Sequence, residues 1–526
     1  MQSNSIEKTF IKMNTMNKIF VILGLGFITL LSACSLEEEP ISEATPDTIY
    51  SSASGIEDGV NGVYSVLREL YGTQQGFTLN TFGTDIFQHG KDGGYKAMDY
   101  YSVDLNSSLG YIEDIWTDCY LGINAANTVL DRIESVESIS ESEKETFKAE
   151  VRFLRAHYYY WLTLQFGDVV LRETETQGVN TEDGRTDKEV IWQLMKEDTE
   201  FAVETLDWSS SDYGRVTKGA ALHQLARILL LTQDYAGAEA AAARVINEGP
   251  YQLLSSYADV FEYDNQENDE IIFSTQYTTD ALNNGSGNTG HLYFTPAYDK
   301  FDGLVRDLTQ GGRPYTRFRP TEFYRNLFDA NDSRFDVTFR SVWFYNDESS
   351  LPAGATVGDT VIWEIEDGVF SKVAPNNNTM HWGLKKHDDP TRASYQDTRG
   401  FRDFFVFRLS ETYLLAAEAA VMQGNTQEAA GYLNVVRSRA AKENTTITLA
   451  TASDMDMDAI LDERARELGG ECMRWMDLAR TGKLVERVKA YNENGSASIE
   501  SYHTLRPIPQ AQIDLTTIDF PQNDGY

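Results

Sequence analysis

The chain has 526 residues, and its 81 acidic residues against 45 basic ones give a formal net charge of −36 at pH 7. Such a surface repels phosphate backbones and anionic lipid headgroups, which argues against nucleic acid as a partner and leaves neutral ligands and cations compatible. A hydrophobic content of 41% allows a packed core, and the length indicates two or more lobes or a helical array.

The first 33 residues are predicted to be a lipoprotein signal peptide. Three lysines precede a short apolar run, 19–31, which is too short to span a bilayer comfortably and is typical of a secretory signal. The residues Leu-Ser-Ala-Cys that follow have the form of a bacterial lipobox, and this resemblance implies cleavage before Cys34 and a lipid on its thiol. Met1 and Met16 both stay open as the start of translation, because the segment after Met16 is a complete signal by itself.

The chain after the signal peptide is divided by its patterns into four predicted parts. Residues 34–50 are acidic and polar and are predicted to be the lipidated tether. Residues 51–265 are predicted to be helical, since apolar residues recur at spacings of three and four over 56–67, 115–136 and 147–161. Residues 266–405 are rich in Gly, Asn, Asp and aromatics and are predicted to be long loops with a few short strands, and 406–526 to be helical again.

Two segments have the pattern of one helical hairpin used twice. In the first, twelve positions separate Ala226 from Ala238, and in the second the same spacing separates Ala417 from Ala429. Small residues at these places allow two antiparallel helices to approach closely, and the spacing resembles that of tetratricopeptide repeats. The predicted fold class is therefore mostly α: tetratricopeptide-like hairpins form a scaffold, and a loop-rich variable region carries a few short strands.

The sequence shows no enzyme motif and predicts neither a cofactor nor a metal site. It contains no HExxH, GxSxG or P-loop pattern. The acidic and basic residues of 462–484 are interpreted as local helix pairs, namely Asp462 with Arg466, Glu471 with Arg474 and Asp477 with Arg480.

Two cysteines remain after Cys34, and they lie far apart in the sequence. Cys119 and Cys472 are expected to be free buried thiols, and a disulfide between them is the alternative.

Several blocks in order along the chain resemble hallmarks of the SusD/RagB family of outer-membrane nutrient-binding lipoproteins. These blocks are 60–71, 151–171, 407–420, 462–484, 505–510 and 521–526. The resemblance implies a helical scaffold, an outward-facing lipoprotein of the outer membrane, and a non-enzymatic role: binding oligosaccharide and delivering it to a TonB-dependent SusC-like transporter. The alternatives are the same role for peptides or another nutrient, a transporter lid without its own affinity, and, less favoured, a surface glycosidase.

A sugar site needs flat aromatic rings and planar polar groups, and loops have to supply them because the helices are committed to packing. In 341–345, alternation is expected to expose Trp343 and Tyr345 and to bury Phe344, although the opposite registry is open. Trp382 is expected to be exposed in a polar stretch. The predicted ligand-binding residues are Trp343, Tyr345, Trp382, Asp85, Tyr95 and Arg313.

Overall fold

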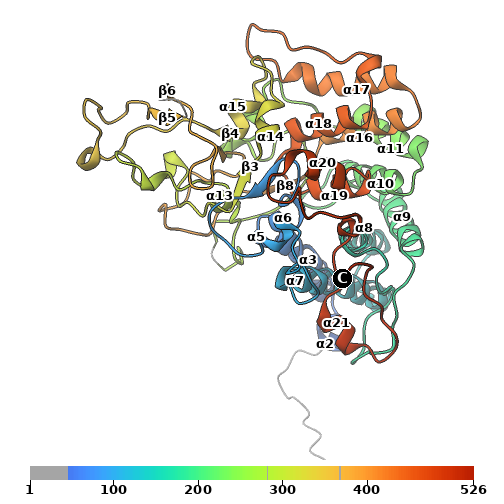
Figure 1. Cartoon of the computed structure of the whole chain (residues 1–526). Coiled ribbons are helices and arrows are strands. Elements are labelled where there is room, and N and C mark those ends of the chain that lie inside the picture. The colour runs from blue at the N-terminus through green and yellow to red at the C-terminus, as the bar shows by residue number, and fades with distance from the viewer. Residues whose placement is uncertain (1–45, 281, 366–368) are drawn as a thin grey trace, which may run out of the picture. The chain divides into compact units, whose positions relative to one another are not determined.

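The computed structural model describes residues 46–280, 282–365 and 369–526 (Figure 1). The signal peptide and Cys34 lie outside the described residues. Helix α2 (Pro46–Ile49) belongs to a unit separate from residues 50–526, which form one compact unit. Within the described ranges, the model contains no helix with the length and apolar character that a membrane crossing requires.

The first half of the compact unit is a set of helices whose ends follow from capping residues. Ser52 accepts a hydrogen bond from the backbone N–H of Gly55 at the start of α3, and Ser140 does the same for Glu143 at the start of α8. Helix α8 contains the predicted helix over 147–161 and ends at Gly167, whose φ of 74° suits glycine. The helices are α3 (Ala53–Ser65), α4 (Leu67–Leu70), α5 (Gln74–Asn80), α6 (Ala97–Tyr100), α7 (Gly110–Arg132), α8 (Glu141–Phe166) and α9 (Lys188–Thr205).

Both predicted hairpins are present. The first consists of α10 (Lys218–Leu231) and α11 (Tyr235–Glu248), and the second of α16 (Leu409–Met422) and α17 (Thr426–Arg439). The alanines 226, 238, 417 and 429 are fully buried at the positions where the helices approach closely. Helix α11 packs on α16, so the two hairpins stack on one another as the repeat pattern predicts.

Short helices and turns complete the described chain. The remaining helices are α12 (Tyr257–Val260), α13 (Gly290–Tyr293), α14 (Glu322–Asn326), α15 (Arg334–Thr338), α18 (Met457–Leu468), α19 (Arg474–Arg480), α20 (Leu484–Tyr491) and α21 (Gln510–Leu515). Single 3₁₀ turns occupy 133–135, 263–265, 298–300, 308–310, 348–350, 452–454 and 501–504.

The strands are short, and within the described ranges each pairs antiparallel with one partner, which is distant in the sequence for every pair except the neighbouring β5 and β6. The pairs are β1 (Phe87–His89) with β3 (Phe318–Pro320), β2 (Ile271–Thr275) with β8 (Phe404–Arg408), β4 (Phe339–Arg340) with β7 (Gly383–Leu384), and β5 (Trp363–Ile365) with β6 (Val369–Ser371). In the first pair Gln88 lies opposite Arg319. This pair fixes the loop after α5 to the variable region, more than two hundred residues later in the chain. The mostly helical fold with few short strands is confirmed.

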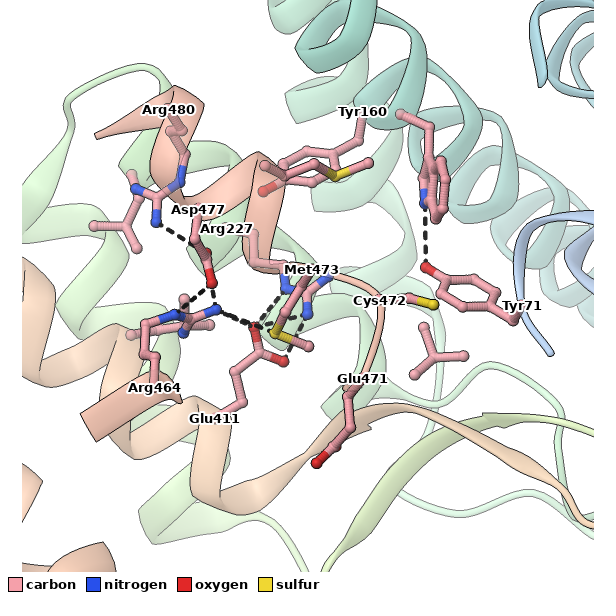
Figure 2. Close-up of a pocket in the computed structure, with 15 residues that line it drawn as sticks. Tyr71, Tyr160, Arg227, Glu411, Arg464, Glu471, Cys472, Met473, Asp477 and Arg480 are labelled. Atoms are coloured by element: carbon pink, nitrogen blue, oxygen red, sulfur yellow. Dashed lines mark hydrogen bonds and ion pairs between the residues drawn. The ribbon is translucent and has the colours of Figure 1, made fainter. Parts of the chain in front are cut away.

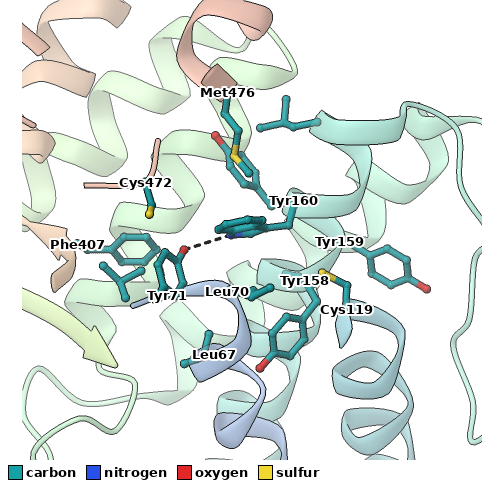
Figure 3. Close-up of a cluster of buried hydrophobic side chains, with 14 of the residues drawn as sticks. Leu67, Leu70, Tyr71, Cys119, Tyr158, Tyr159, Tyr160, Phe407, Cys472 and Met476 are labelled. Carbon is teal, nitrogen blue, oxygen red and sulfur yellow. Dashed lines mark hydrogen bonds between the residues drawn. The ribbon is translucent and has the colours of Figure 1, made fainter. Parts of the chain in front are cut away.

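The main hydrophobic core lies between the N-terminal helices and the C-terminal segments (Figure 3). Tyr71 and Trp161 lie at its centre, where the indole Nε1 donates to the Tyr71 hydroxyl at 3.1 Å. Cys119 and Cys472 are both buried and free, so the expectation of two thiols rather than a disulfide is confirmed. Figure 3 shows Cys119 beside Tyr158, away from Cys472.

The charged residues of 462–484 pair mainly across the fold rather than with the helix neighbours that were predicted. Arg464 donates to Asp477 at 2.8 Å and to Glu411 at 3.2 Å, as Figure 2 shows. Only Asp477 and Arg480 contact each other as predicted, at 3.5 Å. The other predicted pairs are wrong. Arg466 pairs with a different helix neighbour, Glu463, and the remaining charges have partners outside their own helix or turn: Asp462 pairs with Arg487, Glu471 with Arg408 and Lys386, and Arg474 with Asp85.

Candidate functional site

The variable region buries the two aromatic residues that were expected to be exposed. Trp343 is 0% exposed and Tyr345 is 8% exposed, whereas Phe344 is 47% exposed. The alternation is therefore present in the opposite registry, and the predicted face is wrong. Trp343 packs with Tyr298 and Trp363 in a small separate core, and its indole donates to the carbonyl of Gln310 at 3.2 Å. Neither buried ring offers a face to a ligand in this structure.

Trp382 is also buried, at 1% exposure, so its predicted exposure is wrong. Its indole donates to the carbonyl of Ala374 at 3.0 Å, and the Arg325 guanidinium lies 4.4 Å above its ring. Trp382 is flanked by polar residues in the sequence, but residues from other segments bury its side chain in the folded protein.

Asp85 is fully buried and ion-paired, which removes it from any surface available to a ligand. Arg474 donates to it at 2.8 Å and Arg487 donates to it at 2.7 Å. Although burial alone would raise the pKa of Asp85, these two guanidinium groups hold the pKa below its usual value. Asp85 therefore stabilises the fold through buried ion pairs and is not available to bind a ligand.

Tyr95 and Arg313, in contrast, are partly exposed and lie in one surface cluster. We call Tyr95, Tyr111, Tyr293 and Tyr315 the tyrosine cluster. The rings of Tyr95 and Tyr111 stack with centroids 3.6 Å apart and an interplanar angle of 18°, and those of Tyr293 and Tyr315 lie 6.1 Å apart. All but Tyr293 are partly exposed. Burial and the neighbouring Tyr95 hydroxyl raise the pKa of Tyr111, so the Tyr111 phenol stays neutral at physiological pH.

Two arginines lie over the rings of the tyrosine cluster. The guanidinium of Arg317 is 4.7 Å from the centroid of Tyr315 and 5.5 Å from that of Tyr293, and the guanidinium of Arg313 is 5.3 Å from Tyr315. Cation–π contacts of this kind hold a guanidinium by its flat face. The cluster thus combines exposed aromatic surface with planar hydrogen-bond donors.

Backbone hydrogen bonds from distant segments bring the cluster together. The N–H of Gly90, just after β1, donates to the carbonyl of Arg317, and the N–H of Arg317 donates to the carbonyl of Tyr293, both at 2.9 Å. Tyr293 ends α13, and Tyr111 lies in the first turn of α7. The early loop, the variable region and the N-terminal helices therefore all contribute to the tyrosine cluster.

Two non-glycine residues of this site adopt the left-handed backbone conformation. Tyr95 has φ of 59° and Thr316 has φ of 51°. Such conformations are unfavourable for residues with a side chain and are concentrated at functional sites. Gly93, with φ of 108°, packs against Arg317, where an added Cβ would come within 2.9 Å of the arginine Cγ. The strained backbone at Tyr95 and Thr316 supports a functional role for the surface formed by the tyrosine cluster.

Sequence reasoning did not find Tyr111 or Arg317 as site residues. Tyr111 is the second residue of α7 and carries no pattern that distinguishes it from a core position. Arg317 stands two residues after Tyr315 in the same loop as Arg313, and this Arg-x-Tyr-x-Arg spacing was the available signal.

A separate cleft of about 490 Å³ lies between the 258–263 segment and the variable region. Its charges are mixed and largely satisfied: Arg340 pairs with Asp388, and Arg392 and Arg402 donate to backbone carbonyls. Within the described ranges, no group of His, Cys, Asp and Glu is arranged to hold a metal ion. The cleft is polar, but it lacks the exposed stacked rings of the tyrosine cluster.

Comparisons with known proteins place the chain in a family. Residues 260–526 match the model of the SusD family, and residues 36–230 match a model described as "Starch-binding associating with outer membrane". A SusD-like protein of Formosa agariphila is 28% identical over 93% of this chain and 96% of its own length. The starch-binding protein SusD of Bacteroides thetaiotaomicron is 28% identical over 90% of this chain and 87% of its own.

A solved structure of a laminarin-binding SusD-like protein shares the fold. It superposes with a TM-score of 0.71 at 23% identity, covering 91% of this chain and 100% of that chain. The SusD family model matches more than half of the residues. The helical scaffold and the order of the sequence blocks agree with that match. The chain belongs to the SusD family.

Proposed function

We propose that this protein is a cell-surface lipoprotein of the outer membrane that binds oligosaccharide or polysaccharide at the tyrosine cluster. It delivers the glycan to a TonB-dependent SusC-like transporter. The observation that carries the proposal is the partly exposed stack of Tyr95 on Tyr111, together with Arg313 and Arg317 held over the ring of Tyr315 in the same cluster.

The chemistry of the cluster suits a sugar. Sugar rings present apolar C–H faces that pack on aromatic rings, and hydroxyl groups that accept hydrogen bonds from planar donors. The Tyr95–Tyr111 pair supplies the ring surface, and the two guanidinium groups supply donors. The four phenol hydroxyls add groups that both donate and accept.

The relatives support the same class of ligand and the same location. One relative is named as starch-binding and one structural neighbour as laminarin-binding, and one matching family description associates its members with the outer membrane. The lipid anchor is assigned to Cys34 on its lipobox sequence. The role in uptake and the transporter partner follow from the family resemblance.

Binding rather than catalysis is proposed because the buried carboxylates have structural partners. Glu463, Glu467 and Glu471 of the 462–484 block each contact at least two basic side chains. A glycosidase needs two carboxyl groups that face a bound sugar, and carboxylates fixed in buried ion pairs do not meet this need.

Calorimetric titration of residues 35–526, which include the whole compact unit, tests the proposal. Plant, host and microbial oligosaccharides are titrated, with peptides as a comparison. Saturable binding of a glycan that Tyr111→Ala weakens at least tenfold is expected. The matched control is Tyr491→Ala, because Tyr491 also stacks on an aromatic ring, that of Phe323 at 3.8 Å, but lies on α20 and is more exposed than Tyr111.

The outcomes separate the alternatives. Binding of peptides alone would assign the same architecture to another nutrient. Unchanged glycan binding in Tyr111→Ala would move the site elsewhere, with the 490 Å³ cleft as the next candidate. Absence of binding to every ligand would favour a lid without its own affinity.

A further inference from the structure

Arg313 and Arg317 differ from most arginines of this acidic protein. With 81 acidic residues in the chain, most arginines pair with a carboxylate, as Arg464 does with Asp477. The side chains of Arg313 and Arg317 make neither an ion pair nor a hydrogen bond with any part of the chain that the structure describes; their contacts are with tyrosine rings. Two neighbouring guanidinium groups are thus left without a counter-charge.

The way in which they are held leaves their donors available. A guanidinium that stacks on an aromatic ring uses its face, while its N–H groups point outward in the plane of the group. Those N–H groups match the geometry of a carboxylate or a sulfate, to which arginine binds with two parallel hydrogen bonds. The rings therefore fix the orientation of the two arginines without occupying their donors.

The backbone under these arginines is also fixed. The carbonyl of Arg317 accepts from Gly90, and the carbonyl of Thr316 accepts from the N–H groups of Lys91 and Asp92 at 2.9 and 3.1 Å. The aliphatic part of Arg317 packs on Gly93. Because less freedom remains to be lost, an anion bound here would cost little additional ordering.

Carboxylates near the cluster are Asp114 and Asp118 on the α7 side and the exposed Asp92 in the early loop, whose backbone N–H donates to Thr316. Asp114 and Asp118 follow Tyr111 on that helix, and burial together with Asp118 raises the pKa of Asp114. Their negative charge disfavours an anion beside Tyr111. The anionic group of a ligand therefore belongs at the other end of the cluster, where Arg313 and Arg317 meet Tyr315 and Tyr293.

We propose that Arg313 and Arg317 form a subsite for an anionic substituent, so that the glycan recognised by the tyrosine cluster is acidic and carries carboxylate or sulfate groups. The inference rests on the proposed glycan-binding function and makes it more specific. On a protein with a net charge of −36, a local pair of unpaired guanidinium groups would attract such a ligand against the overall repulsion.

Charge-matched pairs of probes test the subsite. Oligogalacturonides are compared with their methyl esters, and sulfated galactan oligosaccharides with their desulfated counterparts, by calorimetric titration at low and high salt. At least tenfold tighter binding of one acidic probe than of its neutral counterpart is expected, with a loss of this preference in high salt. Binding of the oligogalacturonide would identify a carboxylate as the ligand group, and binding of the sulfated galactan would identify a sulfate.

The variants Arg313→Gln and Arg317→Gln should each weaken binding of the acidic probe at least tenfold and leave binding of its neutral counterpart within about twofold. Arg244→Gln is the matched control, since this exposed arginine lies on α11 beside Glu248. Thermal unfolding of each variant checks that the fold is retained.

Two results would overturn the inference. Equal binding of acidic and neutral probes, unaffected by either arginine variant, would leave a neutral-glycan site and the proposed function intact. Binding of neutral glycans without binding of any acidic probe would also reject the anionic subsite and leave the proposed function intact. If no glycan of either kind binds, the proposed function fails together with the subsite.

Discussion

The guanidinium of Arg474 donates two hydrogen bonds to the carboxylate of Asp85, although 389 positions separate the two residues in the sequence. Arg487 donates to the same carboxylate at 2.7 Å. These contacts fasten the loop after α5, which leads into β1, to the C-terminal helices α19 and α20. Arg474 and Arg487 are thus long-range attachments, and they hold the segment that positions the tyrosine cluster.

Replacing this carboxylate should destabilise the protein without changing the ligand surface directly. Asp85→Asn leaves the buried Arg474 guanidinium without its counter-charge, which should lower the free energy of unfolding by about 3–5 kcal/mol. Urea denaturation measures the change. Asp92→Asn, an exposed aspartate in the same loop, serves as control and should change stability by less than about 0.5 kcal/mol. An equal, small effect of both substitutions would contradict a structural role for Asp85.

Adjacent residues in the variable region should respond oppositely to truncation. Trp343 is 0% exposed and Phe344 is 47% exposed. Trp343→Ala should therefore lower the free energy of unfolding by about 3–5 kcal/mol, whereas Phe344→Ala should change it by less than about 0.5 kcal/mol. Denaturant unfolding followed by circular dichroism distinguishes them. The reverse order would show that the original registry, with an exposed Trp343, is the right one.

Acid should destabilise the fold below about pH 6.5. Burial lowers the pKa of all seven histidines: His157 and His291 to about 3, His89, His381, His387 and His503 to about 4, and His223 also downward. The unfolded chain therefore binds more protons than the folded one below pH 6.5. As the pH falls, each histidine lowers the free energy of unfolding by at most about 1.4 kcal/mol per pH unit, until the pH reaches the pKa of that histidine in the folded protein.

Two buried aspartates act in the opposite direction. Burial raises the pKa of Asp99 and Asp403 to about 6, so they favour the folded state as pH falls from about 6 to 4. Burial also raises the pKa of six further carboxylates, which act in the same direction: Glu69, Asp114, Asp118, Glu150, Asp198 and Glu239. Because the histidines of the unfolded chain already take up protons near pH 6.5, we expect them to dominate and the free energy of unfolding to fall from pH 7 to pH 5. Urea denaturation across this range measures the slope, and a stability that is constant or rises toward pH 5 would disprove the dominance of the histidines.

The two buried thiols should be inert in the folded protein. Burial raises the pKa of Cys119 and of Cys472 well above the usual range, which suppresses the reactive thiolate. A chain that lacks Cys34 should release no chromophore from a thiol-exchange reagent under native conditions and two equivalents in urea. Reaction of either cysteine in the native state would indicate local opening around Tyr158 or around Phe407, where Figure 3 shows them.

The sequence predicted the scaffold well because helix periodicity and small-residue spacing are local signals. Alanines at positions 226, 238, 417 and 429 encode close helix approach, and the structure buries all four. The ion pairs of 462–484 were not predictable in the same way. Arg474 has a suitable partner three residues away in Glu471, but it pairs with Asp85, because tertiary burial selects among many available charges.

The site was predicted only in part for a related reason. Alternation in 341–345 gives two equivalent registries, and the packing of Trp343 on Trp363, which the sequence does not reveal, decides between them. Tyr95 and Arg313 were named because their residue types suit a sugar and they stand in predicted loops, and the structure places both in the tyrosine cluster. Tyr111 and Arg317 join them only through the β1–β3 pairing and the fold of α7, which are long-range features.

A crystal structure of the protein with the tightest-binding oligosaccharide tests the central claim most directly. The account predicts a sugar ring in van der Waals contact with the Tyr95–Tyr111 stack and within hydrogen-bond distance of Arg313 or Arg317. Electron density for the sugar in the 490 Å³ cleft, or on another face with the tyrosine cluster empty, would contradict it.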